Sequence, residues 1–106
     1  MTPFIQIATT TATKDEAQQI ASVLIDQRLV ACAQVSGPLV SVYHWQGKVD
    51  TSDEWLCTVK TRETLFDRVS IAIRAVHSYQ CPEIVATPII AASPDYLAWM
   101  EREVAE

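Results

Sequence analysis

The sequence predicts an α+β domain with the ferredoxin-like order β-α-β-β-α-β, a long central hairpin and a C-terminal helix. Three observations predict it: strand and helix patterns alternate, no linker or low-complexity segment interrupts them, and two prolines fall where edge strands are expected. With 106 residues, 49% of them hydrophobic, the chain suits one domain over residues 1–106.

The first third of the chain predicts a strand, a helix and a strand. Residues 3–10 combine apolar and β-branched side chains, as strands do. Thr13 starts the pattern T-K-D-E, a capping box in which the Thr13 hydroxyl and the Glu16 carboxylate each satisfy a free backbone N–H. Apolar residues at helical spacing then continue to about Arg28, and residues 29–35 predict the second strand.

The middle of the chain predicts a hairpin that is too long for its domain. Pro38 interrupts the ladder, a strand resumes over residues 39–45, Gln46-Gly47 forms a tight turn, and the return strand runs to about Thr61. Each arm of about 14 residues would reach ~46 Å, whereas a helix of about 15 residues reaches ~22 Å. The hairpin should therefore overhang the core.

The projecting part of the hairpin is too apolar to be fully exposed to water. It carries Val42, Tyr43, Trp45, Val49 and Trp55. We expect the hairpins of neighbouring chains to extend one another's sheets and make a homo-oligomer. The alternative is a local turn in which Trp45 and Trp55 fold back on the core.

The last third predicts a helix, a strand and a short helix. Residues 62–76 have a helical apolar face, and residues 84–91 read as the last strand. Ser93-Pro94 should begin the terminal helix, with Ser93 as N-cap. In a ferredoxin-like sheet the first and third strands are central, so Pro38 and Pro88 both fall in edge strands, where proline is tolerated.

Charge and cysteine usage limit the partners and the compartment. Eight basic residues are scattered among thirteen acidic ones, for a net charge of −5, so we expect no nucleic acid. With no long apolar run and no signal segment, we expect no membrane contact and a cytoplasmic protein. Three unpaired cysteines agree with a reducing compartment; Cys32 and Cys57 should be buried, and Cys81 should lie in a loop.

Several stretches of the chain resemble the CutA divalent-cation-tolerance family. They are R-L-V-A-C-A-Q-V (28–35), S-V-Y-H-W-Q-G-K-V (41–49), E-W-L-C-T-V-K-T (54–61), H-S-Y-Q-C-P-E-I (77–84) and D-Y-L-A-W-M (95–100). The resemblance implies a ferredoxin-like fold and a tight homotrimer formed through the long hairpin, similar to PII signalling trimers. It also implies a non-enzymatic role in the response to divalent metal ions, copper among them.

The stretch H-S-Y-Q-C-P-E offers candidate metal ligands in His77, Cys81 and Glu83. The resemblance places the family's copper ligands at Thr9 and at His77 with its neighbour Val76, so this chain lacks two of three. A single imidazole does not make a tight site, although Cys81 could substitute as a soft ligand with Glu83 as an oxygen donor. We therefore expect weak or no intrinsic metal binding.

These residues also have readings without a metal. His77 can cap the second helix by bonding its free carbonyls. Glu83 can pair with Lys60 or Lys48 of another subunit. His44, in the middle of a hairpin strand, suits a cross-strand or subunit contact.

An inter-subunit cleft is the second candidate site. We expect it to be lined by Tyr43, Trp45, Lys48, Lys60 and Tyr79. Such a cleft would suit a small anionic metabolite, which makes a PII-like ligand sensor the alternative function. Two glycines cannot form a Gly-rich phosphate loop, and no catalytic motif is present, so we predict no enzyme.

Overall fold

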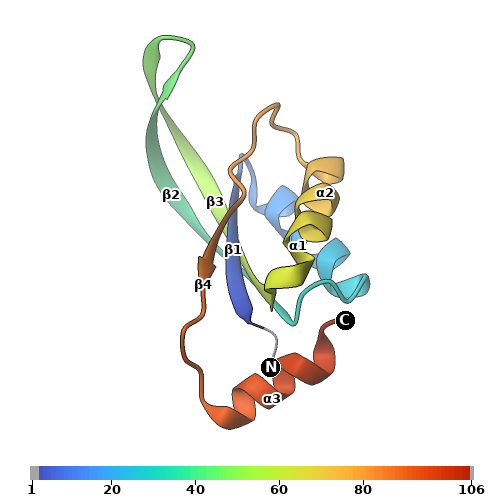
Figure 1. Ribbon diagram of the computed structural model, residues 1–106. Coiled ribbons are helices and arrows are strands. Elements are labelled where there is room, and N and C mark those ends of the chain that lie inside the picture. Colours follow the sequence, from blue (N-terminus) through green and yellow to red (C-terminus); the bar gives the residue numbers. More distant parts are fainter. Residues whose placement is uncertain (1–2, 106) are drawn as a thin grey trace.

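A computed structural model describes residues 3–105, which form a four-stranded antiparallel sheet with helices (Figure 1). The strands are β1 (Phe4–Thr11), β2 (Cys32–Trp45), β3 (Lys48–Arg62) and β4 (Val85–Pro88). The helices are α1 (Lys14–Asp26), the 3-10 turn η1 (Glu63–Leu65), α2 (Phe66–Val76) and α3 (Pro94–Glu103). The sheet order β2-β3-β1-β4 confirms the ferredoxin-like prediction, with β1 and β3 central.

The two proline positions agree with this order. Pro38 lies in β2 and Pro88 in β4, the two edge strands. The strand limits differ from the prediction at both edges. β2 begins at Cys32, and β4 has only four residues.

The hydrophobic core lies between the sheet and the two longer helices, α1 and α2 (Figure 1). Ile7 and Val59 of the central strands are buried, and so are Leu24 of α1 and Ile73 of α2. Side chains alternate between the two faces of a strand, so the neighbours of these residues, such as Ala8, point away from the helices. Within residues 3–105, α1 and α2 therefore cover one face of the sheet.

The start of α1 is capped by one half of the predicted box. The Glu16 N–H donates to the Thr13 hydroxyl at 3.2 Å, as predicted. The Glu16 carboxylate, however, accepts the N–H of Ser78, 2.6 Å away, rather than closing the box. A tertiary contact thus replaces the predicted local one. At α3, Pro94 occupies the first turn as predicted, but Ser93 makes no side-chain cap bond.

The β2–β3 hairpin projects beyond the helices, as predicted (Figure 1). Its ladder shifts register between Ser36 and Leu39, and its tight turn has positive φ at Gln46 (52°) and Gly47 (80°). Positive φ is the reason for glycine in this turn. The two tryptophans of the hairpin differ. Trp45 is 42% exposed, as expected for a projecting hairpin, whereas Trp55 packs against the core, as in the alternative.

The C-terminal helix is held to the sheet by a buried arginine. Arg62, at the end of β3, donates from Nη2 to the carbonyl of Glu101 at 2.9 Å and from Nε to that of Ala105 at 3.3 Å. The bond to Glu101 satisfies a carbonyl that the end of α3 leaves free, and the bond to Ala105 holds the segment that follows the helix. Within residues 3–105, no helix is long and apolar enough to cross a membrane.

Candidate functional site

The loop between α2 and β4 contains most of the predicted site residues, and three elements hold it in place. The His77 Nε2 donates to the Thr10 carbonyl of β1 at 2.9 Å. The Ser78 N–H donates to Glu16 of α1, and the Tyr79 hydroxyl donates to the Glu54 carboxylate of β3 at 2.7 Å. The loop is therefore positioned by β1, α1 and β3 together.

His77 has both ring nitrogens in use. The Tyr79 N–H can only donate, so the Nδ1 atom 3.1 Å away accepts that bond through its lone pair. The Thr10 carbonyl can only accept, so Nε2 carries the proton. The ring is therefore neutral with its hydrogen on Nε2, and its side chain is 0% exposed.

This arrangement corrects the capping prediction for His77. The residue does lie at the C-cap of α2, but its ring bonds β1 rather than the free carbonyls of its own helix. The distance in sequence between residues 77 and 10 hides this contact from any local reading. His77 is thus a link between the loop and the central sheet.

The predicted metal ligands do not fit a tight site within one chain. No group of three or more His, Cys, Asp or Glu side chains within residues 3–105 is arranged to hold a metal ion. Imidazole binds a metal through a free lone pair, and His77 has none to offer. Cys81 and Glu83 are both exposed, and Thr9, which lacks a metal-binding thiol, is buried with an unpaired hydroxyl.

The three cysteines differ in burial. Burial raises the pKa of the Cys57 thiol to about 11, so it stays a thiol at neutral pH. Cys57 is buried as predicted, whereas Cys32 is only half-buried. Cys81 is the exposed loop cysteine that the sequence indicated.

A cavity of about 700 Å³ lies between the hairpin and the α2–β4 loop. The loop contributes Tyr79, Cys81 and Glu83, and the hairpin contributes Tyr43 and Trp45. Three of the five predicted cleft residues thus line one cavity within a single chain. The part of the cleft that a second subunit would form stays a prediction.

The two predicted cleft lysines lie elsewhere. Lys48 stands at the tip of the hairpin, opposite Trp45 in the ladder. Lys60 donates to the Gln34 side chain at 3.0 Å. Neither residue lines the cavity.

The cavity is acidic instead. Asp50, Glu54 and Glu83 line it, and no lining residue that the structure describes is Lys, Arg or His. Opposite charge is what favours binding of an ion. This cavity, as one chain forms it, therefore has no positive side chain to attract an anionic metabolite.

Tyr79 and the buried Glu54 are joined by a hydrogen bond in the cavity wall. Burial raises the pKa of Tyr79 well above its usual range, and the Glu54 carboxylate that it bonds raises the pKa further. Tyr79 therefore keeps its proton and remains a donor to Glu54. The prediction that its hydroxyl would find a partner is confirmed.

Sequence reasoning missed Glu16, Asp50 and Glu54. Glu54 is 6% exposed although its neighbour Asp53 is exposed. Alternation along β3 places Glu54 on the face opposite Cys57 and Val59, so it gave no signal of burial. The contact of Glu54 with Tyr79 could not be read from it.

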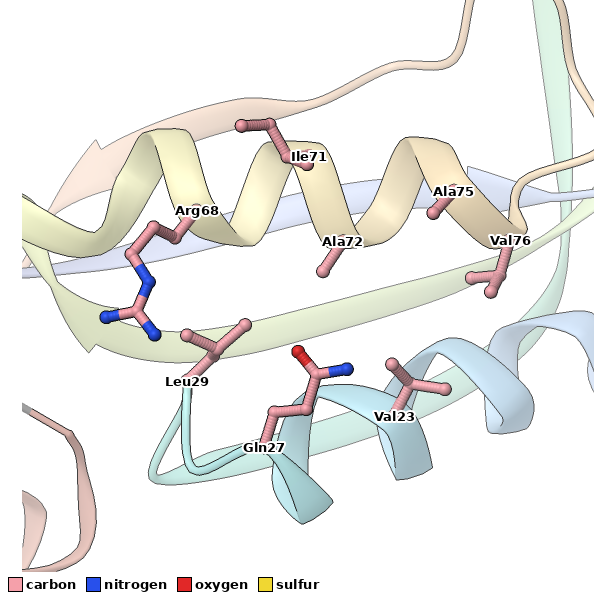
Figure 2. A pocket seen from close by; sticks show the side chains of 8 residues that line it. All are labelled: Val23, Gln27, Leu29, Arg68, Ile71, Ala72, Ala75 and Val76. Carbon is pink, nitrogen blue, oxygen red and sulfur yellow. The ribbon is translucent and has the colours of Figure 1, made fainter.

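A second hollow, of about 340 Å³, lies between α1 and α2 (Figure 2). Its walls are mostly apolar, with the Arg68 guanidinium at one end. It contains none of the predicted site residues and no acidic side chain. The chemistry-bearing residues thus gather at the hairpin cavity.

Comparison with known proteins gives one consistent answer. A family model described as "CutA1 divalent ion tolerance protein" matches residues 5–103. "Protein CutA 1, chloroplastic" of Oryza sativa subsp. japonica is 36% identical over 104 residues, which are 98% of this chain and 59% of that protein. The "Divalent-cation tolerance protein CutA" of Thermus thermophilus is 38% identical over 93 residues, which are 88% of this chain and 90% of that protein.

A solved structure agrees in three dimensions. The crystal structure of CutA1 from Oryza sativa superimposes with a TM-score of 0.95 at 35% identity and covers 99% of this chain and 96% of that one. The chain thus spans little more than half the length of the rice protein (59%), but nearly all of the part seen in the crystal.

Proposed function

The chain belongs to the CutA1 divalent ion tolerance protein family, and from this premise we propose that it acts as a homotrimer in the tolerance of divalent metal ions, copper among them. The observation that carries the trimer is the projecting part of the hairpin, which has large exposed apolar side chains in the described chain. Val40 and Val42 are each 66% exposed and Val49 is 64% exposed.

The edge strand β4 offers a second exposed surface with apolar residues. All four residues of β4 are exposed, Val85 at 54%, and Ile90 beyond it is 93% exposed. Apolar patches of this kind are covered by a partner in stable proteins. Hairpins that extend a neighbour's sheet would cover both surfaces and pair the open edge of β2.

The proposal includes no tight metal centre built by one chain. His77 has no free lone pair and no three-ligand group is arranged, so metal contact is limited to weak binding at Cys81, with Glu83 as a further donor. It also includes no catalytic step, because His77 is not free to act as a base for Cys81. Three free thiols favour the cytoplasm, whereas the name of the rice relative places that protein in the chloroplast.

Sedimentation velocity tests the trimer with a matched pair of variants. The wild type should sediment at three times the chain mass of 11.8 kDa. Val40→Lys places a charge on the hairpin without repelling its ladder partner Asp53, and it should dissociate the assembly. Ile71→Lys on α2 alters a residue of similar exposure, 69%, and should leave the trimer intact. A wild-type monomer at micromolar concentration would refute the trimer.

Calorimetric titration with Cu²⁺ tests the metal part. We expect weak binding in the wild type, a further loss in Cys81→Ser and no change in folded His77→Ala. Tight stoichiometric binding that disappears in His77→Ala would contradict the proposal.

A further inference from the structure

The cavity beside the hairpin has the volume of a small-molecule site and is partly open to solvent. Its volume of about 700 Å³ lies within the range of roughly 300–1,000 Å³ that such sites occupy. Its walls come from the hairpin and from the α2–β4 loop. Because that loop is bonded to β1, α1 and β3, the cavity has fixed walls without a bound ligand.

Glu54 is the residue that points to a ligand. It is 6% exposed, and the structure records one hydrogen bond to its carboxylate, from the neutral Tyr79 hydroxyl to Oε2. No Lys, Arg or His within residues 3–105 makes a salt bridge with it. A buried carboxylate is costly unless it is paired with a cation, so Glu54 lacks a counter-ion that its position calls for.

Two further carboxylates line the same cavity. Asp50 and Glu83 are exposed, and within residues 3–105 neither makes a salt bridge with a basic residue. Three negative groups around one hollow raise the local concentration of cations. A ligand with more than one positive centre can therefore pair with more than one of them.

The aromatic walls favour an organic cation over a bare metal ion. Tyr43 is 40% exposed and Trp45 is 42% exposed, and both line the cavity together with Tyr79. Aromatic faces attract ammonium groups and also contact the carbon chain that joins them. The carboxylates, by contrast, form no group that could ligate a metal directly.

We propose that this cavity binds a small organic cation with two or more amino groups, one of which bonds Glu54. The inference goes beyond the proposed trimer and metal response. It replaces the anionic metabolite of the alternative function with a ligand of opposite charge. The other conceivable occupant is a basic side chain of a second copy, which the test below separates.

Isothermal titration calorimetry with 1,4-diaminobutane and with spermidine tests the site, at about 0.15 M salt so that the net charge of −5 is screened. The wild type should bind one ligand per chain. Glu54→Gln keeps an acceptor for Tyr79 but removes the charge, and it should weaken binding by about tenfold or more. Asp53→Asn removes a charge from the next residue of β3, outside the cavity, and should change Kd by less than about twofold.

Several outcomes would overturn the proposal. They are the absence of binding by either amine, equal weakening in Glu54→Gln and Asp53→Asn, and equally tight binding of the dianion glutarate. If the Lys48→Met variant bound an amine and the wild type did not, the counter-ion of Glu54 would be Lys48 of another copy. That result would also overturn the proposal. Sedimentation of the same samples reports the trimer independently, so failure of the site and failure of the assembly are distinguishable.

Discussion

Replacing His77 with alanine should lower the free energy of unfolding by about 3 to 5 kcal/mol. The ring is 0% exposed and bonds two backbone groups, the Thr10 carbonyl and the Tyr79 N–H. Leaving each of these groups without a partner costs about 1 to 2 kcal/mol, and loss of the buried ring adds about 1 kcal/mol or more. The sum is large for one substitution and marks a structural role.

Urea unfolding followed by tryptophan fluorescence measures this effect. Protein concentration must be matched between variants, because assembly stabilises the folded chain by mass action. His77→Gln can restore one of the two bonds and should fall between wild type and His77→Ala. Gln80→Ala, an exposed position in the same loop, should change stability by less than about 0.5 kcal/mol.

One result would refute this reasoning. If His77→Ala lowered stability by less than about 1 kcal/mol while abolishing Cu²⁺ binding, His77 would be a metal ligand rather than a structural link. The hydrogen-bond assignment of its two nitrogens would then be wrong. The calorimetric and unfolding measurements therefore need to be made on the same preparations.

Two further predictions concern the hairpin and the buried thiol. Gly37→Ala should cost at least about 1 kcal/mol more than Gly47→Ala in urea unfolding, because a Cβ at Gly37 would meet the Trp55 ring at 2.8 Å whereas one at Gly47 meets nothing within 4 Å. An equal loss of stability in the two variants would show that the positive φ of each glycine, and not the contact with Trp55, determines the effect of both substitutions. Burial raises the pKa of Cys57 from 9.0 in the unfolded chain to about 11 in the folded chain. Between these values the unfolded thiol ionises before the folded one, which favours unfolding. The free energy of unfolding should therefore be unaffected below pH 9 and fall by about 2 to 3 kcal/mol as pH rises through 11. Cys57→Ala should flatten the alkaline loss of stability between pH 8 and 11, Cys81→Ala should not, and parallel curves for wild type and Cys57→Ala would contradict the assignment.

The amino-acid sequence by itself determined the elements, their order and the shape of the sheet. Hydrophobic period separates strands from helices, and the order of the elements predicted which strands lie at the edges of the sheet. Pro38 and Pro88 agreed with that assignment, because proline is not tolerated in central strands. The turn at Gly47 followed from the need for positive φ. These are local properties, each decided within a few residues of the chain.

The tertiary structure decided which polar groups meet. Glu16 was expected to close its own capping box but bonds Ser78, and His77 was expected to cap its own helix but bonds Thr10. Both contacts join residues more than 60 positions apart. Local patterns give no information about such pairs, because only the packing of α1 and the loop against β1 brings them together.

The character of the cavity was decided in the same way. The sequence led us to expect an inter-subunit cleft lined by Tyr43, Trp45 and Tyr79 together with two lysines; the three aromatic residues line this cavity, and the lysines lie elsewhere. Folding places Glu54 there instead, buried against Tyr79. The sequence shows only that a charged side chain must be solvated or paired with an opposite charge. The fold decides which groups lie close enough to pair with it.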